Sequence, residues 1–210
     1  MKQILSALIC LIFCSTFVAG QPCVAQGDPK ITPEERARLV QGLKVSQKEF
    51  FAMVEGLSDA QWNYTPSLGV WSVGLVAEHI LRTEELLFAT AERALASPAN
   101  PEWAQKTAGK DQFLERALLS RTNRAQAPLE VRPQGKMTRA EIISRFQEIR
   151  AKMLKFVETT DLPLKAHTVD HPFPVFGTLN AYQWLAYIPF HTMRHTHQMA
   201  KVKANPNFPK

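Results

Sequence analysis

The stretch LNAYQWLAYIPFHTMRHTHQMAKV, residues 179–202, determines the predicted fold because it can form one long amphipathic helix. Five of its residues follow one another by three, four, four and three positions and therefore share one helix face: Ile188, His191, His195, Met199 and Val202. Apolar residues dominate this face, so we expect it to point into a protein core and to carry both histidines with it. Pro189 predicts a kink just before them.

Three more amphipathic helices are predicted upstream, at about residues 32–57, 72–95 and 138–157. The first and third begin with capping boxes, formed by Thr32 with Glu35 and by Thr138 with Glu141. Prolines end the second helix, and a further helix at about residues 101–121 follows before a Pro/Gly-marked loop. Residues 161–177 are predicted to form a loop, and no alternating strand pattern is evident. The sequence therefore predicts an all-α fold, a four-helix bundle with an extra helix and loops between the second and third helices.

The N-terminal residues differ from the rest of the chain. Lys2 is followed by an apolar run over residues 4–18 and by small residues up to Ala25, which is typical of a secretory signal peptide. We therefore expect residues 1–25 to be a signal peptide and residues 26–210 to form one domain, exported to a periplasmic or extracellular location. A retained N-terminal anchor is the alternative. All three cysteines lie in residues 1–25, so the cleaved protein would carry no thiol.

Charge and composition limit the choice of partners. The formal net charge is +6, and basic residues are mostly interspersed with acidic ones, which is typical of a solvated surface. No nucleic-acid-binding motif is present, and a nucleic-acid partner is not expected. After signal cleavage we expect no stable membrane insertion. The sequence does not decide between a monomer and a homodimer.

The placement of three histidines indicates a metal site. His191 and His195 are four positions apart, so their imidazoles lie one turn apart on the same helix face and can share an ion. His79 lies in the second predicted helix with largely apolar neighbours on its face, namely Leu75, Val76, Thr83 and Leu86. Three inward imidazoles are costly to desolvate without partners, and one divalent metal ion would satisfy all three. Separate core histidines, each hydrogen-bonded to a neighbour, are the alternative.

Several motifs resemble the DinB/YfiT-like family. They are LSDAQW (57–62), Pro66, GVWSV (69–73), EHI (78–80), FGTLNAYQW (176–184) and HTMRHTHQM (191–199). The resemblance covers roughly residues 35–208 and is weakest over residues 96–136. It implies an antiparallel four-helix bundle with long crossover connections. It also implies a divalent metal ion on three histidines, at positions that match His79, His191 and His195.

The resemblance implies metal-dependent thiol chemistry, because family members with known activity include thiol transferases and a maleylpyruvate isomerase that uses a low-molecular-weight thiol. Three histidines also leave coordination positions open, so we expect a divalent-metal-dependent hydrolase or thiol transferase that acts on a small molecule. If the chain is exported as expected, a thiol cosubstrate from the cytoplasm would not reach it, which argues against the thiol-dependent reactions. A non-catalytic, metal-stabilised bundle that binds a ligand or a protein partner is the alternative function. Three nitrogen ligands suit zinc, which we favour, and also nickel, iron or copper. The sequence identifies no catalytic acid or base.

Six further residues near these motifs receive weaker assignments. We expect Trp71 to be a core aromatic residue at the start of the second helix. We expect Glu78 to be a surface acid or an acid that contacts a metal-ligating residue, rather than a metal ligand itself. Arg194 and Gln198 flank the histidines and could orient an anionic substrate, although pairing on the helix surface is the default. His167 and His171 are expected in a solvated loop, from which they could line the entrance to the site.

Overall fold

The computed structural model describes residues 27–120 and 126–210, so the predicted signal peptide, residues 1–25, lies outside the described part. The helices are α1 (Pro33–Val54), α2 (Asp59–Asn63), α3 (Val73–Ala96), α4 (Trp103–Lys106), α5 (Lys110–Leu119), the 3₁₀ turn η1 (Leu129–Val131), α6 (Arg139–Thr159) and α7 (Ala181–Lys203). The strands are β1 (Thr168–Asp170) and β2 (Thr178–Asn180). None of the described helices combines the length and apolarity that a membrane crossing requires.

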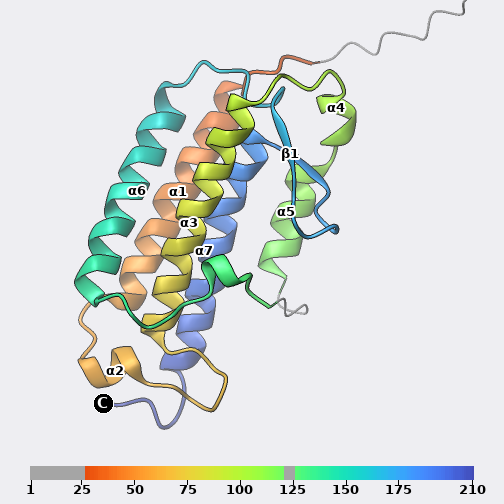
Figure 1. Cartoon of the computed structure of the whole chain (residues 1–210). Coiled ribbons are helices and arrows are strands. Elements are labelled where there is room, and N and C mark those ends of the chain that lie inside the picture. The colour runs from red at the N-terminus through yellow and green to blue at the C-terminus, as the bar shows by residue number, and fades with distance from the viewer. Residues whose placement is uncertain (1–26, 121–125) are drawn as a thin grey trace, which may run out of the picture.

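Four long helices, α1, α3, α6 and α7, lie side by side and form the predicted four-helix bundle (Figure 1). Helices α1 and α7 run in one direction, and α3 and α6 run in the opposite direction (Figure 1). The long connection from α3 to α6 travels the length of the bundle and carries α4, α5 and η1, and α5 packs against α7. This arrangement confirms the predicted all-α fold and its extra helical segment between the second and third long helices.

Local start and stop signals explain the bounds of the long helices. The predicted capping boxes of Thr32 and Thr138 are both present, and a third box, in which Asn180 is the N-cap, starts α7 at Ala181. Helix α1 ends at Val54 rather than at residue 57, because the chain turns at Gly56, whose φ is 69°. Helix α7 continues through Pro189.

Two segments differ from the prediction. The helix expected over residues 101–121 is divided into α4 and α5, because Gly109 adopts a left-handed φ of 70° between them. The loop expected over residues 161–177 contains β1, which pairs with β2 as an antiparallel ribbon with Val169 opposite Leu179. Strands of three residues are too short to produce a visible alternation of apolar and polar positions, so the sequence pattern did not indicate them.

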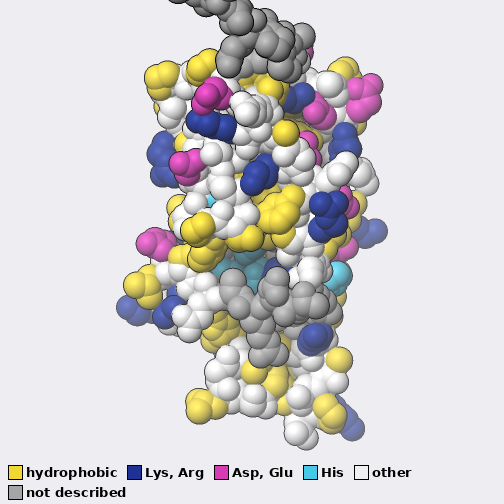
Figure 2. Space-filling model, turned by 90° about the vertical axis from the view of Figure 1, so that its right-hand side faces the viewer, with side chains coloured by type: hydrophobic (Ala, Val, Ile, Leu, Met, Phe, Trp, Pro, Cys, Tyr) yellow, Lys and Arg dark blue, Asp and Glu magenta, His cyan; other side chains and the backbone are white. Residues whose placement is uncertain are grey.

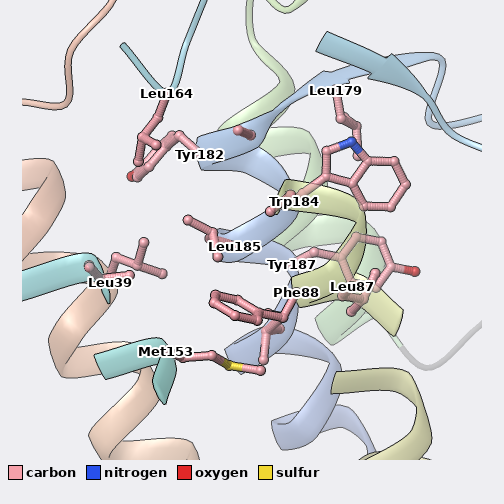
Figure 3. Packing of buried hydrophobic residues seen from close by; sticks show 14 of the residues in the cluster. Leu39, Leu87, Phe88, Met153, Leu164, Leu179, Tyr182, Trp184, Leu185 and Tyr187 are labelled. Atoms are coloured by element: carbon pink, nitrogen blue, oxygen red, sulfur yellow. The ribbon is translucent and has the colours of Figure 1, made fainter. Parts of the chain in front are cut away.

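The core of the bundle consists of two hydrophobic clusters stacked along its length. The first is built around Leu43, Phe88, Met153 and Leu185 and is covered at its end by the β ribbon (Figure 3). The second contains aromatic and aliphatic side chains that include Phe50, Trp62, Ile80, Phe146 and Met199. Burial of these side chains is the main favourable contribution to the stability of the bundle.

A buried polar layer lies between the two clusters, and each long helix contributes one side chain to it. Arg150 of α6 donates hydrogen bonds to both carboxylate oxygens of Glu84 of α3, with Nε to Oε2 at 2.7 Å. Its guanidinium also reaches Ser46 of α1 at 2.9 Å and Thr192 of α7 at 3.0 Å. Arg150 and Glu84 are fully buried. The layer therefore fixes the four helices at one height relative to one another.

The start of α3 leaves room only for glycine at position 74. A Cβ atom on Gly74 would lie 2.3 Å from Nε1 of Trp62, whose buried indole packs directly on the helix backbone. We expect Gly74→Ala to lower the free energy of unfolding by about 1–3 kcal/mol, the usual cost of overpacking. Chemical denaturation monitored by circular dichroism measures this change.

Gly42→Ala is the matched control for this prediction. A Cβ atom there would meet only the ring of Pro189, at 3.3–3.4 Å, and alanine favours the interior of α1. Its effect should stay within about 1 kcal/mol because the contact is mild and the helix propensity improves. Equal losses in the two variants would contradict the steric role of Trp62.

Candidate metal centre

Three imidazoles meet between α3 and α7. His79, His191 and His195 each offer a ring nitrogen, and these three atoms lie within 4.8 Å of one another. The ring centroids are 4.6 Å apart for His79 and His195, 4.4 Å for His191 and His195, and 5.1 Å for His79 and His191. His79 and His191 are buried, and His195 is partly exposed. The structure thus brings together the three residues that the sequence predicted as metal ligands.

The local fold accounts for this convergence. Ser72 caps the first turn of α3, and His79 lies about two turns further along that helix. His191 and His195 lie one turn apart on α7, which packs against α3 along its length. Figure 2 shows histidine side chains recessed in one face of the molecule, with hydrophobic side chains beside them. Of the three residues, His195 is the one that remains partly exposed.

Hydrogen bonds to Nδ1 orient two of the three rings. Nδ1 of His79 lies 2.8 Å from the carbonyl oxygen of Val131, and Nδ1 of His195 lies 2.8 Å from Oε1 of Gln198. Because each of these oxygens accepts, Nδ1 carries the proton, and the Nε2 lone pair of both rings stays available. Metal-ligating histidines are commonly held by such a bond on their other nitrogen. Both rings therefore have the tautomer that a metal requires.

The third ring has an unsatisfied atom. Nδ1 of His191 is buried and has no hydrogen-bond partner among the described residues. A buried polar atom without a partner costs about 1–3 kcal/mol. The donor set consists of three neutral nitrogen atoms, which suits zinc and other divalent transition metals. The residues present therefore fit a divalent ion.

Burial keeps all three imidazoles uncharged. It lowers the pKa of His195 to about 3, with a smaller lowering from His79 beside it. Burial also lowers the pKa of His79, more strongly than the Val131 carbonyl raises it. For His191, burial and then the neighbouring His195 and His79 hold the pKa well below its ordinary value. Protons therefore compete weakly for the lone pairs at neutral pH.

Aromatic rings and a buried carboxylate surround the triad. Trp71 is partly buried and packs against the second core cluster, and its ring centroid lies 5.0 Å from that of His79, so it also borders the site. Glu78 is buried rather than on the surface. It accepts hydrogen bonds from the backbone amides of Gln134 and Gly135, at 3.0 and 2.8 Å, and pairs with Arg82. Glu78 thus attaches the long connection to α3, and none of these partners is one of the three histidines.

The other weaker assignments are resolved in different ways. Arg194 donates hydrogen bonds to the carbonyl oxygens of Leu118 and Ser120 at the end of α5, so it ties α5 to α7. Gln198 orients His195. Nδ1 of His167 lies 2.8 Å from the carbonyl oxygen of Ser97. Arg194 and His167 therefore have structural partners within the chain.

His171 is not a solvated loop residue. Its ring is stacked on Trp184, with a centroid distance of 5.0 Å and an angle of 8° between the planes. Its Nδ1 accepts a hydrogen bond from the backbone N–H of Phe173 at 2.9 Å. Burial lowers the pKa of His171 to about 4.

Sequence reasoning missed several residues around the site. Val131 supplies a carbonyl oxygen from an irregular segment, which no side-chain motif can reveal. Tyr187 lies one turn before His191, with ring centroids 6.1 Å apart, and its i, i+4 spacing was an available signal. Leu86, expected on the inner face of α3, is 40% exposed, while the polar Glu84 is fully buried.

The buried histidines predict a loss of stability in mild acid. Below pH 6.5 the unfolded chain binds protons at its histidines, whereas folded His171 stays neutral down to about pH 4. The unfolded state then binds more protons, so the free energy of unfolding falls as the pH is lowered through this window. We expect His171→Phe to reduce this linked proton uptake by up to about one proton per molecule.

Urea denaturation of metal-free protein between pH 7.5 and pH 4 measures the slope of the free energy of unfolding. The value at pH 7.5 serves as the reference for each variant, because the substitution itself changes the packing. Identical slopes for wild type and His171→Phe would contradict the assignment of His171 as a neutral buried ring.

Comparisons with known proteins agree with this architecture. The model of the DinB superfamily matches residues 42–199. YuaE of Bacillus subtilis (strain 168), an uncharacterized protein, is 27% identical over 152 residues, which cover 71% of this chain and 88% of YuaE.

A solved structure has a similar fold. YfiT from Bacillus subtilis, described as a probable metal-dependent hydrolase with an unusual four-helix bundle topology, aligns with a TM-score of 0.59 and 13% sequence identity. The alignment covers 85% of this chain and 91% of YfiT. At this identity the likeness establishes the fold.

Proposed function

Since the chain belongs to the DinB superfamily, we propose that it is a metal-dependent hydrolase of a small molecule, with a divalent ion held by His79, His191 and His195. The observation that carries this proposal is the meeting of three neutral imidazoles, two of them with Nε2 left free by a bond on Nδ1. The description of YfiT as a probable metal-dependent hydrolase supports the same reaction class.

A bound divalent ion would supply Lewis acidity toward an oxygen of the substrate, and three protein ligands leave coordination positions open. We propose zinc as the ion, because three histidines with an open position are a common catalytic zinc site. The chain itself orients the ligands. Val131 and Gln198 fix the tautomers of two rings, and the ring of Trp71 lies beside His79 and that of Tyr187 beside His191.

The two buried carboxylates of α3 are engaged elsewhere. Glu78 accepts from backbone amides of the long connection, and Glu84 is paired with Arg150. Neither carboxylate joins the three histidines in the candidate metal group. We therefore assign proton transfer during hydrolysis to neither Glu78 nor Glu84.

The proposal is tested by a hydrolysis screen on zinc-loaded protein with carboxylic esters, amides and phosphoesters. We expect activity in the wild type, its loss in His195→Ala, and its retention in His197→Gln, because His197 is exposed on the same helix. Equal activity in wild type and His195→Ala would reject the proposal. A large loss of thermal stability on chelation with no activity in any form would favour the non-catalytic, metal-stabilised bundle.

We also propose that the protein is exported, on the basis of the apolar run and the small residues within residues 1–25. Mass spectrometry of the protein recovered from its producing cells tests this. An N-terminus near residue 26 is expected, and a full-length chain in the cytoplasmic fraction would contradict export.

A further inference from the structure

A group of aromatic rings in contact with one another lies beside the three histidines, and the proposed function does not yet use it. We call this group the aromatic cluster, and it consists of Phe113, His171, Phe176, Trp184 and Tyr187. These residues come from α5, from the segment around the β ribbon and from α7. Tyr187 connects the aromatic cluster to the triad, because its ring centroid lies 6.1 Å from that of His191.

Three rings of the aromatic cluster are nearly parallel, and the two phenylalanine rings are tilted against their neighbours. His171 lies at 8° to Trp184 and at 17° to Tyr187, with centroid distances of 5.0 and 5.7 Å. The Phe176 ring is tilted, at 49° to His171 and 60° to Tyr187, with centroid distances of 4.4 and 5.5 Å. Lys110 holds the backbone of Phe176 through a 2.7 Å hydrogen bond to its carbonyl oxygen. The result is a set of flat apolar faces in fixed positions.

The aromatic cluster is not sealed inside the protein. Trp184 and Tyr187 are buried, but Phe113, His171 and Phe176 remain partly exposed, and the adjacent Val175 is 66% exposed. Hydrophobic side chains lie beside the recessed histidines on the same face in Figure 2. Partly exposed apolar side chains gathered in one patch are often found where a protein binds a ligand.

Two polar atoms of the aromatic cluster are available to a ligand. The hydroxyl of Tyr187 makes no hydrogen bond to any described residue, and in Figure 3 it points away from the aliphatic side chains of the first core cluster. Because Nδ1 of His171 accepts from the backbone of Phe173, the neutral ring carries its proton on Nε2. Both groups are hydrogen-bond donors, so they suit an acceptor oxygen.

We propose that the aromatic cluster binds a flat aromatic group of the substrate and that the Tyr187 hydroxyl donates a hydrogen bond to an oxygen of that substrate beside the histidines. The inference rests on the proposed hydrolase function and narrows its substrate to small aromatic esters or amides. A planar ring can stack on the nearly parallel rings or meet the tilted ring of Phe176 edge to face, and a puckered aliphatic ring of equal size makes neither contact.

Two ketones of equal heavy-atom count test this proposal, because neither can be hydrolysed. Methyl phenyl ketone and methyl cyclohexyl ketone each carry one acceptor oxygen and differ in the flatness of the ring. Ligand-observed NMR gives the dissociation constant of each for metal-free and zinc-loaded protein. We expect the phenyl compound to bind about two- to tenfold more tightly, the range that aromatic contacts supply.

Three variants test whether the aromatic cluster causes the preference for the phenyl ketone. Phe176→Leu keeps an apolar side chain in a partly exposed position, so it should fold and yet lose most of the preference for the phenyl ketone. Tyr187→Phe should weaken the binding of both ketones by a similar factor, about two- to tenfold, because it removes only the hydroxyl. The control is Phe208→Leu, because the ring of Phe208 packs on Tyr64 at the opposite end of the bundle from the β ribbon (Figure 1). This variant should change neither dissociation constant.

Equal affinity for the two ketones, or a preference that survives in Phe176→Leu, would overturn the inference. The hydrolase proposal is judged separately, by the activity of wild type against His195→Ala. Ketone discrimination without any hydrolysis would support the aromatic cluster as a binding site and reject the hydrolase. Hydrolysis of aliphatic and aromatic esters at equal rates would reject the aromatic subsite and retain the hydrolase.

Discussion

Replacement of His195 by alanine is expected to lower the affinity of the protein for zinc by more than about 100-fold. Loss of a residue that merely orients a ligand already costs about 10–100-fold, and loss of a ligand itself costs more. Gln198→Ala should therefore fall in that lower range, since Gln198 holds Nδ1 of His195 through a 2.8 Å hydrogen bond. Competition with a chromophoric chelator measures both dissociation constants.

His197→Gln is the matched control, because His197 lies two residues from His195 and is exposed. We expect this variant to bind zinc as the wild type does. Similar zinc affinities for wild type and His195→Ala would show that the ion binds elsewhere, and the metal centre would have to be abandoned. Parallel losses in His79→Ala and His191→Ala would show that all three rings act on one ion.

Arg150→Met is expected to lower the free energy of unfolding by about 3–5 kcal/mol. The substitution leaves the carboxylate of Glu84 buried without its charged partner, which is the costly way to break a buried ion pair. It also removes the donors that reach Ser46 and the carbonyl oxygen of Leu43. Urea denaturation of the metal-free protein at pH 7.5 measures the loss.

A neighbouring ion pair on the same two helices provides the control. Arg145 pairs with Glu85 at 2.7 Å, but their side chains are 50% and 32% exposed. Arg145→Met should therefore cost no more than about 1 kcal/mol, the usual contribution of an exposed pair. The double variant Glu84→Leu/Arg150→Met should recover part of the loss, since no charge is then buried. Equal effects of Arg150→Met and Arg145→Met would contradict the importance of the polar layer.

The fold was predictable because its signals are local and repeated. The capping boxes at Thr32 and Thr138 mark helix starts directly, and apolar spacing gave the faces of the long helices. The division of residues 101–121 was not predictable from periodicity, because it depends on the left-handed conformation of Gly109. The β ribbon was missed because each strand contributes only three residues.

The site was predictable only where spacing along a helix expresses it. The four-residue interval between His191 and His195 places both rings on one face. The apolar neighbours of His79 predict that it also points inward, and the family motif supports its link to the other two. The Nδ1 partner of His79 is a backbone carbonyl 52 residues away, and no sequence pattern encodes that contact. The pairing of Glu84 with Arg150 was also hidden, because each is a single charged residue on an otherwise apolar face.

The carbonyl of Val131 belongs to a segment outside the four-helix core, yet it decides which nitrogen of His79 presents its lone pair. Sequence changes in a peripheral loop can therefore alter the reactivity of such a centre while the four-helix bundle stays unchanged. A chimaera that exchanges residues 126–137 between relatives would transplant ligand orientation without transplanting a single ligand.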